Sequence, residues 1–166
     1  KAAMLWTLGC AVVSFFGAGV WGFMHTLSWV NYYTHGTQIT AAHGHLAFFG
    51  AYAMLNMAII SYAMPQLRRL QPYNQIMNMW SFWIMVGGMC FMTFTLTFAG
   101  VVQTHMQRVL GEDFMTVQNQ LDIFFIMRLG SGSAVALGVV LFLIAIFGPA
   151  REQLPAHVKA GNGSSQ

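Results

Sequence analysis

Long runs without a charged side chain constrain this chain more than any other feature. Residues 2–67 and 70–107 contain no Asp, Glu, Lys or Arg. Each run exceeds the roughly 20 apolar residues that a helix needs to cross about 30 Å of hydrocarbon. Charged residues make up only 7% of the 166 residues, against about 25% in soluble domains. The sequence therefore predicts a chain that crosses a lipid bilayer several times, and it excludes a water-soluble globule.

Hydropathy predicts an all-α, polytopic transmembrane bundle of four helices within residues 1–150. We expect the crossings at about 2–23, 40–64, 76–101 and 121–147. Pro65 and Pro72 are expected to bracket the second loop, and Gly148 with Pro149 to end the last helix. The polar segment 151–166 ends in small residues and is predicted to be a disordered tail.

The basic residues predict the orientation of the crossings. The loop after the second crossing holds Arg68 and Arg69, and the tail holds Arg151 and Lys159, whereas the first loop, 24–39, has no Lys or Arg. The positive-inside rule therefore places both ends of the segment in the cytoplasm. The net charge of +3 does not indicate nucleic acid as a partner, because the few basic residues form no stripe.

Small residues in the apolar helices predict where helices pack closely. Glycines are spaced to let another helix approach on the first and fourth crossings: Gly17, Gly19, Gly22, Gly130, Gly132 and Gly138. Cys10 and Cys90 each lie in an apolar run, where a thiol behaves as a small hydrophobic side chain. Neither a disulfide nor a cysteine metal site is therefore indicated.

Two of the six histidines lie close together on one predicted membrane helix, where an ionisable side chain is costly and commonly functional. Side chains two residues apart on a helix point about 200° apart, so His43 and His45 project from opposite sides. They cannot easily share one metal ion. This geometry suits a helix that runs between two haems, with Gly44 leaving room for a macrocycle. A second interpretation fits the spacing equally well: each histidine is a buried polar residue bonded to a neighbouring helix.

Several segments resemble the catalytic subunit of the bacterial nitric oxide reductases, within the haem-copper oxidase superfamily. They are residues 43–54 (HGHLAFFGAYAM), 59–65 (IISYAMP), 31–38 (NYYTHGTQ) and 117–121 (VQNQL). The likeness covers nearly the whole chain. It implies that the four crossings correspond to the last four helices of a twelve-helix subunit, that is, its C-terminal portion.

The resemblance also implies roles for the paired histidines. His43 matches the proximal ligand of the high-spin haem b3, and His45 matches one axial ligand of the low-spin haem b. The implied reaction reduces two NO molecules to nitrous oxide and water at haem b3 and a non-haem iron. Electrons would come from a c-type cytochrome through haem b. The implied partners are the remaining helices of the subunit, a membrane-anchored cytochrome c subunit and the lipid of the bacterial inner membrane.

The ligands that the family uses for the non-haem iron, and the second ligand of haem b, lie on earlier helices than the four that this chain resembles. We therefore expect the non-haem iron to be held by residues outside this chain. The chain is expected to be a C-terminal piece of a longer subunit, or one chain of a split one, and to be inactive alone.

Four further residues are candidates for secondary roles near the outer ends of the helices. His25 and Thr26 are candidates for a proton path, and His35 and Arg128 for contacts with haem propionates. The simpler interpretations are a hydrated helix end, an ordinary loop histidine and an arginine that extends to the interface. Arg128 could also neutralise Asp122.

Three alternatives to this function stay open at the level of sequence. A quinol-dependent nitric oxide reductase or a cbb3-type oxygen reductase subunit shares the two-haem helix but differs in electron source or substrate. A non-catalytic di-haem b-type electron carrier would use both histidines for low-spin haems. A transporter or structural bundle would bind no haem. Spectra separate these classes, because a high-spin ferrous haem binds CO and a bis-histidine haem does not.

Overall fold

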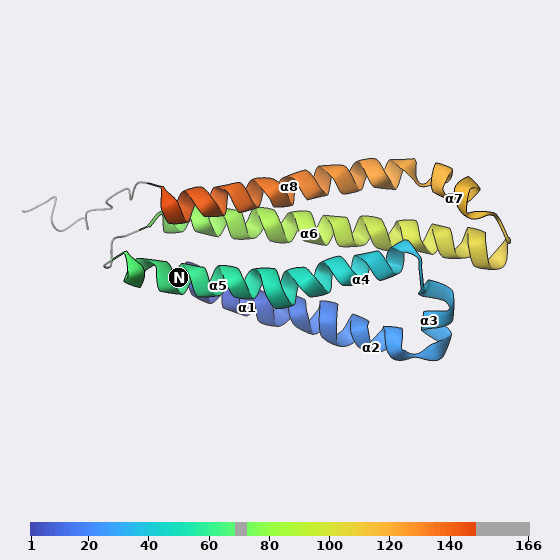
Figure 1. Ribbon diagram of the computed structural model, residues 1–166, viewed down its shortest axis with the longest axis horizontal. Helices are drawn as coiled ribbons and strands as arrows, with labels where there is room; N and C mark the ends of the chain where they lie inside the picture. The colour runs from blue at the N-terminus through green and yellow to red at the C-terminus, as the bar shows by residue number, and fades with distance from the viewer. Residues whose placement is uncertain (69–72, 149–166) are drawn as a thin grey trace, which may run out of the picture.

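A computed structural model describes residues 1–68 and 73–148. The described part consists of helices and their connections, and it contains four helical stretches that are long and apolar enough to cross a membrane: Ala2–Thr26, Gln38–Leu67, Gln75–Val109 and Asp122–Phe147. Figure 1 shows the four stretches side by side. The predicted all-α bundle of four crossings is therefore confirmed. Arg69, Pro72 and the tail 151–166 lie outside the described residues.

One-turn π-helical segments interrupt or end three of the four stretches. The elements, in chain order, are α1 (Ala2–Ser14), η1 (Phe15–Val20), α2 (Trp21–Thr26), α3 (Ser28–Thr34), α4 (Gln38–Phe48), η2 (Phe49–Ala53), α5 (Met54–Leu67), α6 (Gln75–Thr104), η3 (His105–Val109), α7 (Phe114–Gln120) and α8 (Asp122–Phe147). Single π turns within α-helices are uncommon and are frequent at functional sites. The short helices α3 and α7 lie in the connections between the predicted crossings.

The helix that contains Pro65 continues to Leu67, so the expectation that Pro65 ends it is wrong. Proline has no N–H to donate to the carbonyl four residues earlier, which is that of Ser61. The hydroxyl of Tyr73 donates to this carbonyl instead, at 3.1 Å. The third stretch also runs past its expected end, to Val109. It is followed by Gly111, whose φ of +74° favours glycine.

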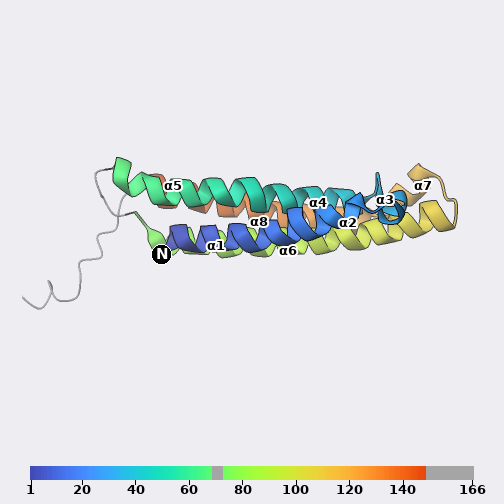
Figure 2. The same cartoon turned by 90° about the horizontal axis from the view of Figure 1, so that it is seen from below.

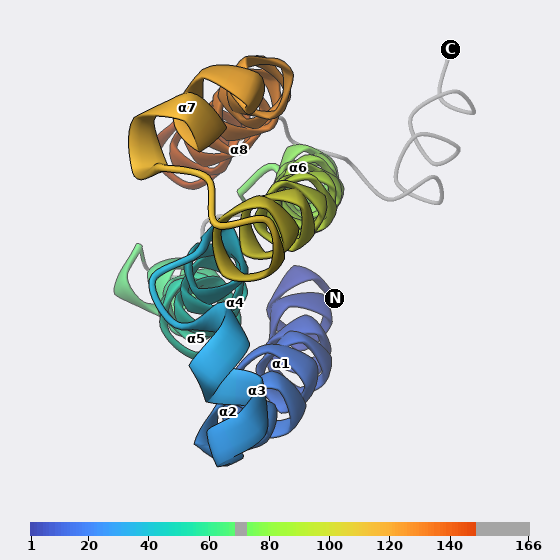
Figure 3. The ribbon, with the colours of Figure 1, turned by 90° about the vertical axis from the view of Figure 1, so that its right-hand side faces the viewer.

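The helix α6 lies in the middle of the bundle, with α8 on one side and α4 and α5 on the other, as the end-on view of Figure 3 shows. The helix α1 packs against α5 and η2. Figures 1 and 2 place α3 and α7 at one end of the bundle and the N-terminus at the opposite end. The helix α4 therefore has the first stretch on one face and α6 on another.

A buried polar cluster joins three stretches near the end of the bundle where the N-terminus lies. The indole of Trp6 in α1 donates to the Asn78 side chain in α6 at 2.7 Å, and Asn78 donates to the Ser61 hydroxyl in α5 at 2.9 Å. All three side chains are buried. Phe82 and Phe142 pack edge-on against the Trp6 ring. Such hydrogen bonds between membrane helices contribute about 1 kcal/mol each, so this cluster helps to fix the register of the helices.

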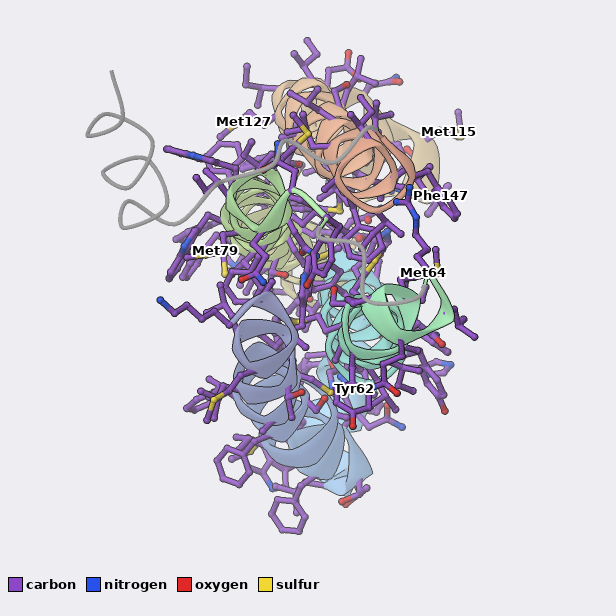
Figure 4. The ribbon with its side chains drawn as sticks, turned by 90° about the vertical axis from the view of Figure 1, so that its left-hand side faces the viewer. Tyr62, Met64, Met79, Met115, Met127 and Phe147 are labelled. Carbon is purple, nitrogen blue, oxygen red and sulfur yellow. The ribbon has the colours of Figure 1, made fainter. Side chains whose placement is uncertain are left out.

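The outside of the bundle is covered with large apolar side chains. Figure 4 shows side chains projecting outward around the helices, with Phe147 on the outside of α8, where it is 66% exposed. Phe94 and Leu129 are exposed to a similar degree, 65% and 71%. In water, apolar patches of this extent lead to association, whereas in a bilayer lipid covers them.

Glycine lets the first and second stretches approach each other closely. A Cβ atom on Gly50 would lie 2.7 Å from the backbone nitrogen of Ser14 and 2.9 Å from the carbonyl carbon of Val13. A Cβ atom on Gly17 would lie 2.9 Å from the carbonyl carbon of Leu46. Both contacts are with backbone atoms, which cannot move aside as a flexible side chain can. The predicted close approach at Gly17 is therefore observed, and Gly50 adds a second point of contact.

Replacing Gly50 with alanine is expected to destabilise the bundle by about 1–3 kcal/mol, the cost of overpacking a close contact. The measurement is unfolding in mixed detergent micelles, followed by circular dichroism. Gly87→Ala is the matched control, because a Cβ atom on Gly87 would meet no neighbouring group within 4 Å and alanine favours the helix. Equal free energies of unfolding for the Gly50 variant and the parent protein would contradict this packing.

The helix α7 begins with a side-chain cap whose strength depends on pH. The Asp113 carboxylate accepts from the Thr116 hydroxyl and from the backbone amides of Met115 and Thr116. The Thr116 hydroxyl bond, followed by the amide bonds, holds the pKa of Asp113 below its ordinary value of 3.8. A lowered folded-state pKa contributes stability above the unfolded-state pKa, and this stability is lost as the pH falls through the folded-state pKa.

We therefore expect the amides of Met115 and Thr116 to lose protection from hydrogen exchange between about pH 7 and about pH 2.5, after correction for intrinsic rates. Asp113→Asn is the control, because asparagine caps the helix without titrating. Its protection should change little over the same range. The cap has no such role if the parent protein and the Asn variant respond to pH alike.

Candidate functional site

Contacts with α6 fix the first turn of α4, the helix that carries the paired histidines. The Thr37 hydroxyl caps this helix by accepting from the Ile39 amide at 3.3 Å. The buried side chain of Gln103 in α6 accepts from the Gln38 amide at 2.9 Å. A side chain on Gly100 would collide with the Ile39 backbone, so glycine lets α6 pass here. These contacts fix the position of α4 along the axis of α6 and its rotation about its own axis.

His43 faces the first stretch of the chain. Its Nδ1 atom lies 2.9 Å from the carbonyl oxygen of Gly17. Its ring stacks on that of His25 with the centroids 4.9 Å apart and the planes at 24°, and Trp21 lies beside it. A carbonyl oxygen can only accept, so Nδ1 carries the proton and Nε2 keeps a free lone pair.

The π turn η1 makes the Gly17 carbonyl available to His43. In an α-helix, the Trp21 amide would donate to the Gly17 carbonyl, four residues earlier. In η1 the Trp21 amide donates to the Phe16 carbonyl instead. The Gly17 carbonyl is thereby released from that amide and accepts from the imidazole of His43. A local irregularity in one helix thus orients a histidine in another.

His45 faces a cavity on a different side of α4. Its Nδ1 atom lies 2.7 Å from the Ala41 carbonyl, one turn earlier in the same helix. The ring lines an open cavity of about 630 Å³ between α4, α6 and α8. The other lining residues are Met92, Phe125, Arg128, Leu129, Gly132, Ser133 and Ala136. A volume of this order suits a cofactor, for which pockets measure about 300–1,000 Å³.

The structure brings two of the four secondary candidates into contact with this site. His25 stacks on His43, and Arg128 lines the cavity beside His45. Within the described residues, no ion pair joins Arg128 to Asp122. His35 is exposed at the end of α3 and is not among the cavity-lining residues, and its carbonyl lies 3.5 Å from the Arg108 side chain. The Thr26 hydroxyl donates to the carbonyl of Phe23 in its own helix.

The fold and its apolar surface define a multi-pass helical membrane protein. The chain belongs to the family of cytochrome c and quinol oxidase polypeptide I (COX1), whose sequence pattern matches residues 1–134. It is 52% identical to a nitric oxide reductase subunit of Stutzerimonas stutzeri, over 86% of this chain and 32% of the relative. The resemblance inferred from the sequence is therefore confirmed. The chain spans about a third of the length of this relative.

Membership of this family implies haem and iron as cofactors, and the two imidazoles fit that requirement. In haem and metal proteins, a ligating histidine donates its other ring nitrogen to a carbonyl or carboxylate. His43 and His45 each do so through Nδ1, which leaves Nε2 for iron. Arg128 adds a cation that suits the carboxylates of a haem. In the part of the chain that the structure describes, no three His, Cys, Asp or Glu side chains gather around a common point.

Two features of this site were missed in the sequence. The role of the Gly17 carbonyl depends on a π turn, for which the sequence carries no clear signal. Gln103 did carry a signal, because it is an amide side chain at the end of an apolar run. In the structure it is 1% exposed. A buried amide must find hydrogen-bond partners, so it indicates a contact between helices.

Proposed function

We propose that this chain is part of a nitric oxide reductase in which His43 binds the iron of haem b3 and His45 binds the iron of haem b. One observation supports this proposal above all others. Two imidazoles on one helix are each tied by Nδ1 to a backbone carbonyl, and they face different neighbouring helices. The similarity to a nitric oxide reductase subunit supports the choice of substrate.

The two haems would supply electron transfer and NO binding. The overall reaction combines two NO molecules, two electrons and two protons into nitrous oxide and water. The chain's own contribution would be to hold both ligands, His43 and His45, on α4, a helix about 10 Å across, and so to keep the two haems on separate sides of one helix. Arg128 would neutralise a carboxylate of the group beside His45.

The rest of the machinery would lie on other helices and chains. A membrane-anchored cytochrome c subunit would deliver the electrons, and residues outside this chain would hold the non-haem iron. A proton path through His25 and Thr26 stays a prediction. Its support is their position near the end of the first stretch, where α3 begins.

We also infer that the chain lies in the bacterial inner membrane with the α3 and α7 end outside. Arg68 lies at the opposite end, where its side chain donates to the Ile146 carbonyl at 2.7 Å and complements the last turn of α8. The aromatic residues Trp29 and Tyr32 in α3 are about 70% exposed, as is typical of side chains at a membrane interface. Together with the positive-inside rule, these positions support cytoplasmic ends.

The experiment uses the protein purified from its native membrane together with the chains that accompany it. We expect low-spin and high-spin b-type haem signals, CO binding by the high-spin haem, and conversion of NO to nitrous oxide with reduced cytochrome c. Activity with quinol alone would indicate the quinol-dependent enzyme, and oxygen reduction in place of NO reduction would indicate an oxygen reductase. Two haems without CO binding would indicate an electron carrier, and the absence of haem would overturn the proposal.

A further inference from the structure

A second imidazole lies against the face of His43. The rings of His25 and His43 are stacked, with their centroids 4.9 Å apart and an angle of 24° between their planes. The Nδ1 atom of His25 lies 3.0 Å from the Trp21 carbonyl, and that of His43 lies 2.9 Å from the Gly17 carbonyl. Gly17 and Trp21 are four residues apart, so the two carbonyls belong to successive turns of one helical stretch. Each ring is therefore hydrogen-bonded to a backbone carbonyl of the same helical stretch, one turn apart, and the two rings are close to parallel.

We propose that His25 is a positioning residue, which fixes the plane of the His43 ring by stacking on it. The bond to Gly17 holds one atom of the His43 ring, but the torsion between its Cβ and ring is soft and has broad minima. A flat partner on one face restricts rotation about that torsion. Gly22 also lies close to this ring, because a Cβ atom there would be in van der Waals contact with the His43 Cε1 atom, at 3.5 Å.

The contacts of His25 itself point to this role. Its Nε2 atom is buried and has no hydrogen-bond partner in the described part of the chain. In the described residues the ring therefore has one hydrogen bond, from Nδ1 to the Trp21 carbonyl, and it stacks on the His43 ring. A buried polar atom without a partner is unfavourable, so the Nε2 atom of His25 does not stabilise this arrangement. The feature of His25 that remains is its flat ring, which stacks on the ring of His43.

This inference rests on the proposed function, because the plane of the His43 ring affects a spectrum only when His43 binds iron. The orientation of an axial imidazole relative to the macrocycle changes the overlap of ligand and iron orbitals, and with it the iron–histidine bond. The iron–histidine stretching band of the ferrous high-spin haem, measured by resonance Raman spectroscopy, reports this bond directly. It does not depend on turnover.

The test compares His25→Leu and His25→Phe in the protein purified from its native membrane. Leucine fills similar space without a flat face, so we expect the band to shift and broaden. Phenylalanine keeps the flat face, so we expect a band close to that of the parent protein. His105→Leu is the control, because His105 is exposed in η3 and the ring that stacks on His43 is that of His25. The low-spin haem signal reports whether each variant is folded.

The outcomes separate this inference from the proposed function. If the parent protein shows no iron–histidine band, the assignment of His43 as a haem ligand fails. If the parent shows the band and His25→Leu leaves it unchanged, stacking does not position His43. The inference also fails if His25→Phe shifts and broadens the band in a protein whose low-spin haem is intact, and this variant decides the matter if the leucine variant does not fold.

Discussion

Replacing His43 with alanine is expected to abolish CO binding by the high-spin haem and to leave the low-spin haem spectrum in place. The His43 side chain is the residue that we propose would bind the iron of that haem. Alanine keeps the helix and removes the nitrogen. The rate of NO reduction should fall by more than about 100-fold, since loss of a hydrogen-bond partner of a metal ligand already costs about 10–100-fold. CO difference spectra and an NO electrode provide the two measurements.

Two controls accompany this prediction: substitution of another histidine, and rescue of a His43 variant with imidazole. His105→Ala changes an exposed histidine in η3, to which no role at the haems is assigned, and should leave both spectra intact. His43→Gly with added imidazole should recover part of the CO binding, because a free imidazole can occupy the vacated space. Simultaneous loss of both haem signals in a folded His43 variant would argue against separate roles for the two histidines.

Replacing His45 with alanine is expected to have the converse effect. The low-spin haem signal should disappear, because His45 is the proposed ligand that this chain provides in the cavity lined by Arg128 and Met92. NO reduction driven by cytochrome c should fall by a similar factor, more than about 100-fold, because haem b is proposed to pass the electrons to haem b3. The measurement is the reduced-minus-oxidised spectrum together with the rate under cytochrome c.

A chemical reductant provides the control for the His45 variant. The high-spin haem should still bind CO when it is reduced directly with dithionite, because His43 lies on another face of α4. Arg128→Lys keeps a cation in the same cavity and should retain the low-spin signal. A low-spin spectrum that survives the loss of His45 would show that another side chain binds that iron.

Much of this architecture could be predicted because it follows from composition and helix geometry. Long runs without charge leave a chain few alternatives to membrane helices, and they predict the four crossings. The divergence of His43 and His45 also follows from geometry, because the angle between residues two apart is a property of any α-helix. The sequence alone does not determine which neighbour each ring faces.

The features that could not be predicted depend on contacts between distant segments. Pro65 is expected to end a helix, but the Tyr73 hydroxyl supplies the missing donor to Ser61 and the helix continues. The release of the Gly17 carbonyl depends on a change from α to π geometry where η1 meets α4. The sequence places His35 among the candidates for haem contact, whereas the structure leaves it outside the cavity beside His45.

The most direct test of the account is a cryo-electron microscopy map of the protein from its native membrane, at a resolution that shows haem and side chains. We predict one haem iron bound to the Nε2 atom of His43 and a different haem iron bound to the Nε2 atom of His45, with the two groups on opposite sides of α4. A map in which either ring lacks iron, or in which both rings bind the same iron, would contradict the account.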